Sequence, residues 1–222
     1  MDDSERGSRA VLFDMDGVIV DSERYWHDAQ MERIFPAALA GDYPDLDETT
    51  GMFYEEIYDY LDAEYETTVS KERFIELFDE AAREMYREQV SLLDGFHDLR
   101  DDLAATDIAV AIVTSAAPEW HAIVTERFDI SVDETVSAAD IDGDGKPAPD
   151  VYEHAAELLD CDPGECLVVE DSKNGVEAGK RAGMTVVAYR TEPNADTDLS
   201  AADVVAEGAD ELHAELRRRT GL

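Results

Sequence analysis

Basic residues are scarce in this sequence, and lysine is the scarcest of them. The 222 residues include 55 Asp and Glu but only 18 Lys and Arg, which gives a formal net charge of -37. A surface this acidic repels nucleic acid and anionic membranes, so we expect neither as a partner. The acids are spread between apolar residues of clear periodicity, which favours a folded protein over a disordered one. Such an excess of carboxylates suits work in concentrated salt, and we expect a halophilic protein.

Cysteine and long apolar runs are also nearly absent. The two cysteines, Cys161 and Cys166, have no second Cys/His pair beside them, which favours packed free thiols over a disulfide or a zinc site. No apolar run approaches the roughly 18 residues that a membrane span needs. The polar, acidic N-terminus does not resemble a signal peptide. We therefore expect a cytoplasmic protein that is a monomer or a weak homo-oligomer.

The most informative short stretch lies near the N-terminus. Residues 10–13 are apolar and predict a buried parallel strand, and Asp14 and Asp16 follow where this strand ends. In open α/β sheets, ligands and catalytic groups lie at the carboxyl ends of the strands. Gly17 would let the backbone turn so that both carboxylates reach that crevice. Taken alone, the same Asp-x-Asp-Gly pattern is equally typical of a solvated turn.

The stretch from residue 22 to 91 differs from the rest of the chain. Apolar residues recur in it at helical spacing, which predicts at least three helices and no strand. Pro36 and the segments 41–44 and 67–70 mark the joints between these helices. A purely helical block directly after a first strand predicts an inserted lid.

From residue 92 onward, strands and helices alternate. This alternation predicts right-handed crossovers and a parallel sheet with helices on both faces. We therefore expect an α/β, Rossmann-like core formed by 1–21 and 92–222, with an inserted all-α domain at 22–91. The later strands are expected at 108–113, 135–137, 167–169, 185–189 and 203–205, and the core helices at 95–105, 118–128, 172–182 and 209–218.

Polar residues follow several of the predicted strands. They are Asp14 and Asp16, Thr114 and Ser115, and Glu170 and Asp171, with Lys146 joining them from a loop. Carboxylates that converge on one crevice repel one another and favour a bound cation, and an all-oxygen set favours Mg²⁺. The lysine ammonium and the threonine hydroxyl suit the oxygens of a phosphate. Together these groups predict a site for phosphoryl transfer.

A second acidic segment, residues 140–145, begins like a calcium-binding EF-hand loop. The twelfth position of such a loop is Glu, whereas this sequence has Val151 there. Lys146 follows the acids directly and would repel calcium. We therefore do not expect calcium at this loop.

Four segments carry a resemblance to a known family. They are Asp14-Met15-Asp16-Gly17-Val18, the strand ending in Thr114-Ser115, Gly145-Lys146-Pro147-Ala148-Pro149-Asp150 and Glu170-Asp171-Ser172-x-x-Gly175. In order and type they resemble the four motifs of the haloacid dehalogenase-like hydrolases, in the branch of beta-phosphoglucomutase and phosphoglycolate phosphatase. The resemblance covers nearly the whole chain, and residues 22–91 look like that family's α-helical cap.

The resemblance implies a role for each core residue. Asp14 would be the nucleophile that forms an aspartyl phosphate, and Asp16 would protonate the leaving oxygen and later deprotonate water. Thr114 would hold the phosphoryl oxygens, and Lys146 would bridge the phosphate and the nucleophile. Mg²⁺ would be held by Asp14, the backbone carbonyl of Asp16 and Asp171, with Glu170 as a ligand or behind the ligands.

The cap is expected to select the substrate. Residues 50–54 stand where relatives place a specificity loop, and Glu23 lies at the hinge, so we expect substrate contacts from Ser115, Glu23, Thr50 and Tyr54. Relatives that move phosphate between sugar hydroxyls carry a histidine and an arginine in the cap. Those positions hold Trp26 and Tyr54 here, although His27 is one residue away and a shift in register would restore the histidine. The two aromatic residues are equally typical of a packed cap core.

The sequence therefore predicts a Mg²⁺-dependent phosphatase that acts on a small phosphorylated metabolite, of the sugar phosphate or phosphoglycolate type. A phosphomutase of the beta-phosphoglucomutase type is the alternative. A dehalogenase is less favoured, because that branch does not need the acid Asp16. A non-enzymatic phospho-receiver is also less favoured, because it carries its acid pair and its phosphorylated Asp in the reverse order and has no place for a helical insertion.

Overall fold

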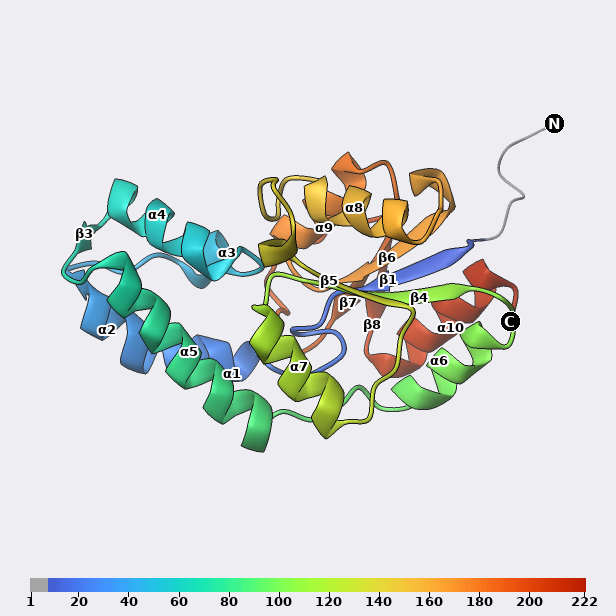
Figure 1. The fold of residues 1–222 in the computed structure, drawn as a ribbon, viewed down its shortest axis with the longest axis horizontal. Helices are drawn as coiled ribbons and strands as arrows, with labels where there is room; N and C mark the ends of the chain where they lie inside the picture. Colours follow the sequence, from blue (N-terminus) through green and yellow to red (C-terminus); the bar gives the residue numbers. More distant parts are fainter. Residues whose placement is uncertain (1–7) are drawn as a thin grey trace.

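The computed structural model describes residues 8–222, so residues 1–7 of the predicted core segment 1–21 lie outside the described residues. The chain forms a six-stranded sheet in the order β5-β4-β1-β6-β7-β8, with every neighbouring pair parallel (Figure 1). Helices cover it on two faces, which confirms the Rossmann-like α/β fold. The strands are β1 (Ala10–Phe13), β4 (Ala109–Thr114), β5 (Glu134–Ser137), β6 (Cys166–Glu170), β7 (Thr185–Arg190) and β8 (Val204–Glu207).

The strand β1 supplies residues to two hydrophobic layers, one on each face of the sheet. Val11 and Phe13 belong to the larger layer, and Ala10 and Leu12 to the smaller, as the alternation of side chains along a strand requires. All four side chains are fully buried, which explains why the strand reads as a continuous apolar run. The helices of the larger layer are α6 (Phe96–Ala104), α7 (Pro118–Arg127) and α10 (Ala209–Thr220), and those of the smaller are α8 (Asp150–Leu158) and α9 (Lys173–Arg181).

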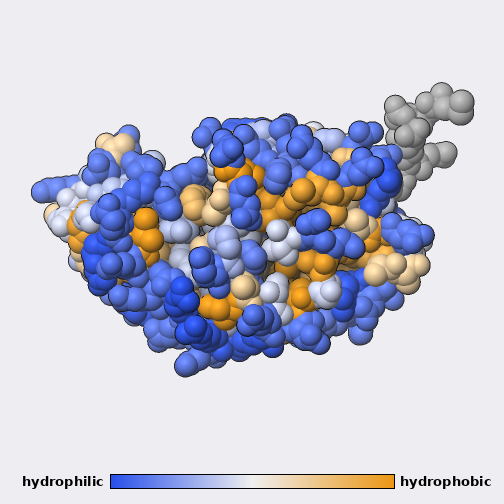
Figure 2. Space-filling view, viewed as in Figure 1, coloured by the Kyte–Doolittle hydropathy of each residue, from blue (hydrophilic) through white to orange (hydrophobic). Residues whose placement is uncertain are grey.

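A helical insertion leaves the sheet after β1 and returns before β4. It forms the lobe beside the sheet core in Figure 1, and α5 packs against α7 of the core. Hydrophilic residues cover most of the face seen in Figure 2, with smaller hydrophobic areas over the core. The elements of the insertion are α1 (Glu23–Ala29), a π-helical turn (Gln30–Ile34), α2 (Phe35–Ala38), α3 (Leu46–Thr49), α4 (Tyr54–Glu64) and α5 (Lys71–Glu88).

One expectation for the insertion is wrong in detail. The insertion contains a short antiparallel pair, β2 (Leu39–Ala40) and β3 (Glu66–Thr67), although no strand was expected. A pair this short leaves no periodicity in the sequence, because each strand has only two residues. Pro36, which was expected to mark a joint, lies in the first turn of α2, directly after the π-helical turn.

The two connections between core and insertion run side by side. Asp21 N–H donates to the Ser91 carbonyl at 3.1 Å, and Leu93 N–H donates to the Ile19 carbonyl at 2.8 Å. The chain therefore leaves the core and re-enters it at one place, with a single paired crossing between the two regions.

The two cysteines are free thiols, as expected. Cys166 is buried at the start of β6, and Cys161 is half-buried in the turn that precedes it. Burial raises the pKa of the Cys166 thiol, which keeps it uncharged. Among residues 8–222, no helix is both long and apolar enough to cross a membrane.

Candidate active site

The floor of the site lies at the carboxyl end of β1. Asp14 is the first residue after this strand, and its backbone N–H donates to the Val169 carbonyl of β6 at 2.9 Å. The parallel register pairs Phe13 with Ile112 of β4 and with Val169, so the residues that follow these strands reach the same edge of the sheet. The next strands, β4 and β5, lie on one side of β1, and the later strands, β6 to β8, lie on the other. Open α/β sheets bind their ligands at the point where the strand order reverses in this way.

Lys146 joins two buried carboxylates on this floor. Its Nζ donates to Asp14 Oδ1 at 2.7 Å, to Glu170 Oε1 at 2.6 Å and to the Val113 carbonyl at 3.2 Å. Burial opposes the charge of the ammonium, but the two carboxylates outweigh it and raise the pKa of Lys146 above its ordinary value. Lys146 is therefore a fixed positive charge beside Asp14.

Glu170 is held by donors on both carboxylate oxygens. Besides the lysine, Oε1 accepts from the Tyr152 hydroxyl at 2.8 Å, and Oε2 accepts from Ser172 Oγ at 3.1 Å and from the Asp171 N–H at 3.1 Å. A Cβ at Gly175 would lie 1.8 Å from Glu170 Oε1, so α9 approaches this carboxylate only because the position is glycine. These contacts place Glu170 behind the floor, where it orients its neighbours.

Asp171 carries an oxygen without a partner. Its Oδ2 is buried and accepts no hydrogen bond, and a Cβ at Gly17, whose φ is +72°, would lie 1.8 Å from it. Oxygens of Asp14, Glu170 and Asp171 lie within 4.8 Å of one another, which is the only such group among the described residues. Burial and then the Glu23 carboxylate raise the pKa of Asp171. A hard divalent cation such as Mg²⁺ fits these donors.

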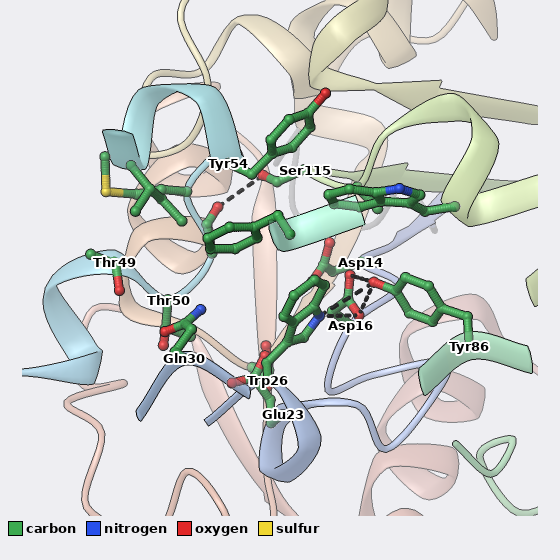
Figure 3. Close-up of a pocket in the computed structure, with 17 residues that line it drawn as sticks. Asp14, Asp16, Glu23, Trp26, Gln30, Thr49, Thr50, Tyr54, Tyr86 and Ser115 are labelled. Carbon is green, nitrogen blue, oxygen red and sulfur yellow. Dashed lines mark hydrogen bonds between the residues drawn. The ribbon is translucent and has the colours of Figure 1, made fainter. Parts of the chain in front are cut away.

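Asp16 lies apart from this group and is held from the side of the insertion. Its Oδ1 accepts from Ser22 Oγ at 2.6 Å, from the Tyr86 hydroxyl at 2.7 Å and from Trp26 Nε1 at 3.3 Å (Figure 3). Burial raises the pKa of Asp16, while the hydrogen bonds from Ser22 and Tyr86 act against that rise. A half-buried acid with donors that also stabilise its carboxylate form can both release and accept a proton.

A cavity of about 60 Å³ separates this floor from the insertion. We call its aromatic wall the roof: Trp26, Tyr54, Phe78 and Trp120. The rings of Tyr54 and Trp120 lie 4.7 Å apart, and those of Trp26 and Phe78 lie 5.4 Å apart, both between centroids. Figure 3 shows Tyr54 above the two aspartates and Trp26 beside them. The roof is formed by three elements of the insertion together with α7 of the core.

The loop between α3 and α4 is docked on the core. Ser115 Oγ donates to the Gly51 carbonyl at 2.8 Å, and Asn174 Nδ2 donates to the Thr50 carbonyl at 2.8 Å. These two bonds come from different strand ends of the core, one after β4 and one after β6. The insertion therefore lies closed over the sheet edge.

The structure brings most of the predicted site residues to one cavity. Three of them lie beneath it: Glu170, Lys146 and Thr114. The Oγ1 of Thr114 accepts from the Ala116 N–H at 3.0 Å and keeps a proton of its own to donate. Those that line the cavity are Asp14, Asp16, Glu23, Thr50, Tyr54, Ser115 and Asp171.

Trp26, and not the adjacent His27, faces the cavity. Trp26 lines the cavity and contacts Asp16, whereas the adjacent His27 does not line it. His27 Nε2 instead lies 3.3 Å from Glu23 Oε2, one turn earlier on α1. The histidine therefore does not take the place of the tryptophan.

Sequence reasoning missed five residues of the site. Tyr86, Trp120 and Gln30 lie on helices among apolar or polar neighbours, where spacing does not show which side chain reaches a cavity, and Tyr152 lies behind the floor. The fifth is Ser22, which occupies the N-cap position of α1. Its hydroxyl makes no cap hydrogen bond and donates to Asp16 instead.

A comparison with protein families identifies the family of this chain. The family model described as haloacid dehalogenase-like hydrolase matches residues 11–189. The chain belongs to the haloacid dehalogenase-like hydrolases. It is therefore an enzyme of the hydrolase class, and the resemblance to this family is confirmed.

Relatives include phosphatases and a mutase. The chain is 29% identical over 213 residues to hexitol phosphatase B of Escherichia coli, which covers 93% of this chain and 95% of that protein. It is 29% identical over 206 residues to beta-phosphoglucomutase of Bacillus subtilis, which covers 86% of this chain and 88% of that protein. A solved structure of CbbY from Rhodobacter sphaeroides with xylulose-(1,5)bisphosphate has 21% identity and a TM-score of 0.78, covers 92% and 96% of the two chains, and supports the fold.

Proposed function

We propose that this hydrolase is a Mg²⁺-dependent phosphatase of small phosphorylated metabolites that works through an aspartyl-phosphate intermediate. The observation that carries the proposal is the separation of two carboxylates that are two residues apart. Asp14 contacts Lys146 on the floor, whereas Asp16 contacts Tyr86 and Trp26 of the insertion. Two carboxylates in different surroundings are suited to two different steps of one reaction.

In the first step, an Asp14 oxygen attacks phosphorus, and the bond from phosphorus to the leaving-group oxygen breaks. Asp16 donates its proton to that oxygen, so the product leaves as a neutral alcohol. Lys146 neutralises charge beside the nucleophile, and Thr114 donates its hydroxyl to a phosphoryl oxygen. The outcome of this step is an acyl phosphate on Asp14 and a carboxylate on Asp16.

In the second step, Asp16 removes a proton from a water molecule that attacks the same phosphorus. The bond from phosphorus to the Asp14 oxygen breaks, which releases phosphate and restores the free carboxylate of Asp14. Hydrogen bonds from Ser22 and Tyr86 support Asp16 while it is charged. Asp16 then carries the proton that the next turnover needs.

Mg²⁺ fits the floor of this site. Asp14, the backbone carbonyl of Asp16 and Asp171 would hold it, and the unpartnered Oδ2 of Asp171 supports this assignment. Glu170, whose two oxygens already accept from protein donors, would stand behind the ligands. When bound, the ion supplies charge stabilisation to the transferred phosphoryl group.

Residues 22–91 would act as the cap of this enzyme. The paired crossing at Asp21 and Ser91 would be its hinge, and closure would exclude bulk water from the reacting phosphate. Glu23, Thr50, Tyr54 and Ser115 would then face the substrate, since all four line the cavity. The division of the chain into 1–21 with 92–222 and 22–91 is part of this proposal.

A phosphomutase is the second candidate, and the similarity to beta-phosphoglucomutase favours it. Hydrolysis is favoured over transfer because the cap positions that hold histidine and arginine in mutases hold Trp26 and Tyr54 in the roof. A dehalogenase has no use for the acid at Asp16. A phospho-receiver would not bring a helical insertion over its acidic residues.

We also expect a halophilic, cytoplasmic enzyme, because the net charge of -37 needs screening. The check is the free energy of unfolding in dilute buffer and in molar KCl. We expect a more stable protein in KCl, and equal stability and activity in both would contradict the halophilic assignment.

The proposed function is tested by a panel of phosphate esters in concentrated KCl with Mg²⁺, with wild type beside Asp14→Asn. We expect wild type to release phosphate, and EDTA or the substitution to abolish the release. An active Asp14→Asn variant, or activity that EDTA leaves unchanged, would contradict the mechanism. Product analysis with a sugar phosphate separates hydrolysis from isomerisation.

A further inference from the structure

The cavity between floor and roof carries negative charge only. Among the described residues, the 17 that line it include no lysine, arginine or histidine. The ionisable carboxyl groups that face it are those of Asp14, Asp16, Glu23 and Asp171. Lys146 lies beneath the cavity and is already paired with two carboxylates. A leaving group with a carboxylate or a second phosphate would therefore meet acids and no matching cation.

Glu23 is one of the acids that would repel an anionic leaving group. It lies on α1 at the entrance to the insertion, is 7% exposed and lines the cavity beside Asp171, whose pKa it raises. Its ion-pair partner, His27, lies on the far side of it, outside the lining. Mg²⁺ held on the floor would neutralise charge on the transferred phosphate, and no side-chain cation lines the cavity to serve a second anion.

The roof offers flat apolar faces to the leaving group. The rings of Trp26 and Trp120 lie 5.9 Å apart between centroids, and Tyr54 and Phe78 extend the same wall. Aromatic rings of this kind pack against the C–H groups of a sugar or polyol as well as against other aromatic rings. The cavity beneath these rings has a volume of about 60 Å³ while the insertion lies closed over the sheet edge.

One polar group in the roof side of the cavity has no partner. Gln30 is 5% exposed, and its Oε1 is buried without a hydrogen bond. The residue lines the cavity next to Thr50 and opens the π-helical turn of the insertion, a local geometry that is frequent at functional sites (Figure 3). By contrast, the hydroxyls of Thr49 and Thr50 already donate to the Leu46 carbonyl. A buried oxygen without a hydrogen-bond partner favours a ligand that supplies a hydrogen-bond donor.

From this charge, shape and unused acceptor we infer that the substrate is the monophosphate of a small neutral polyhydroxy compound, one of whose hydroxyls donates to Gln30 Oε1. This inference rests on the proposed phosphatase function and narrows it. Of the two substrate types expected from the sequence, it keeps sugar phosphates and excludes phosphoglycolate, whose leaving group carries a carboxylate. It also disfavours a mutase, because transfer from a phosphoenzyme to a sugar phosphate creates a bisphosphate, and the roof has no cation for the second phosphate.

The charge of the leaving group is tested with two esters of nearly equal size. In 2-hydroxyethyl phosphate, a CH₂OH group stands where 2-phosphoglycolate has its carboxylate. We expect wild type to show a kcat/KM at least about tenfold higher for the neutral ester, because an unpaired buried charge is rejected strongly. The matched variants are Met52→Lys and Met52→Gln at the cavity wall. The lysine variant is expected to raise the ratio of anionic to neutral ester hydrolysis, and the glutamine variant is not.

The role of Gln30 is tested with Gln30→Met, which keeps the length of the side chain and removes its acceptor. We expect kcat/KM to fall roughly two- to tenfold for erythritol 4-phosphate, as the loss of one hydrogen bond to a neutral group predicts. Benzyl phosphate, which has an alkyl leaving oxygen but no hydroxyl, is expected to be hydrolysed equally well by wild type and variant. The denaturation midpoint of the variant confirms that it is folded.

The outcomes separate this inference from the proposed function. If no ester is hydrolysed, the activated 4-nitrophenyl phosphate included, the phosphatase assignment itself fails. If esters are hydrolysed but 2-phosphoglycolate or a sugar bisphosphate is preferred, the inference fails and the phosphatase assignment stands. An equal loss for erythritol 4-phosphate and benzyl phosphate in Gln30→Met would overturn the contact with Gln30, and a preference of wild type for benzyl phosphate would overturn the polyol assignment.

Discussion

The floor and the roof of the cavity are built from different kinds of residue and in different ways. On the floor, Asp14 and Asp171 follow strand ends, and Lys146 lies in a core loop. Hydrogen bonds from Lys146 hold Asp14 and Glu170, and Gly17 leaves room for the carboxylate of Asp171. The roof is made of helix side chains that pack on one another as rings. Chemistry that must be the same for every phosphate ester belongs on the rigid floor, whereas selection among esters belongs on the roof.

Asp16 stands between the two regions. Its backbone belongs to the turn after β1, but its carboxylate accepts hydrogen bonds from Tyr86 and Trp26 of the insertion. The acid that must reach the leaving group is thus positioned by the same region that contacts the leaving group. Closure of the cap would therefore complete the set of reacting groups.

The largest expected effect is on the floor, in Lys146→Met. This change leaves Asp14 and Glu170 facing each other in the interior without a cation, and we expect a loss of about 3–5 kcal/mol in the free energy of unfolding. Hydrolysis of 4-nitrophenyl phosphate is expected to fall by about 10³-fold or more, because the charge beside the nucleophile is lost. Denaturant titration and steady-state kinetics measure the two effects.

Lys180→Met is the matched control for that change. Lys180 makes an ion pair with Asp203 at 2.7 Å, as short as that of Lys146 with Asp14, but its side chain is 34% exposed. We expect a loss below about 1 kcal/mol and unchanged activity, since exposed pairs contribute little. Equal destabilisation by the two substitutions would show that the stability of the floor does not depend on its buried charges.

The next effect concerns the shape of the floor, in Gly17→Ala. A Cβ at this position would lie 1.8 Å from Asp171 Oδ2, so the carboxylate must move. We expect the Mg²⁺ concentration for half-maximal activity to rise by about tenfold or more, as is usual when residues around metal ligands are disturbed. Titration of activity with Mg²⁺ measures this shift.

Gly183→Ala separates backbone strain from this displacement. Gly183 has a similar φ of +79° but no atom within 4 Å of a Cβ. Both substitutions are expected to cost about 1–2 kcal/mol of stability through the left-handed backbone. Only Gly17→Ala should change the Mg²⁺ requirement, and a parallel change in Gly183→Ala would remove Asp171 from the proposed metal site.

The smallest expected effect comes from the insertion, in Tyr86→Phe. The hydroxyl of Tyr86 lowers the pKa of Asp16 against the rise caused by burial, so its removal raises that pKa further. Because the first step needs protonated Asp16, the alkaline fall of kcat/KM should move to higher pH. The pH profile at saturating Mg²⁺ measures this shift. Trp26→Phe, which removes a longer bond of 3.3 Å, should move it less, and a shift to lower pH in either variant would contradict the role of Asp16.

The sequence was sufficient to place the floor residues together, but of the four roof residues it singled out only Trp26 and Tyr54. Floor residues adjoin continuous apolar strands, and parallel strands bring their carboxyl ends to one edge, so Asp14, Thr114 and Glu170 could be placed together from spacing alone. Roof residues lie on helices, where a period of 3.6 shows which face is buried but not what it meets. The hydroxyl of Tyr86 and the amide of Gln30 therefore left no signal, although both residues lie on helices of the region expected to be helical.

The central claim is that Asp14 carries the phosphoryl group and that Asp16 serves both steps. Acid quenching of Asp16→Asn and wild type during turnover of 4-nitrophenyl phosphate, followed by mass mapping of the phosphorylated peptide, tests it most directly. The activated leaving group needs little protonation, so the account predicts that Asp16→Asn accumulates a phosphoryl group on Asp14 to a higher level than wild type. A phosphoryl group on another residue, or none in either protein while product is released, would contradict the account.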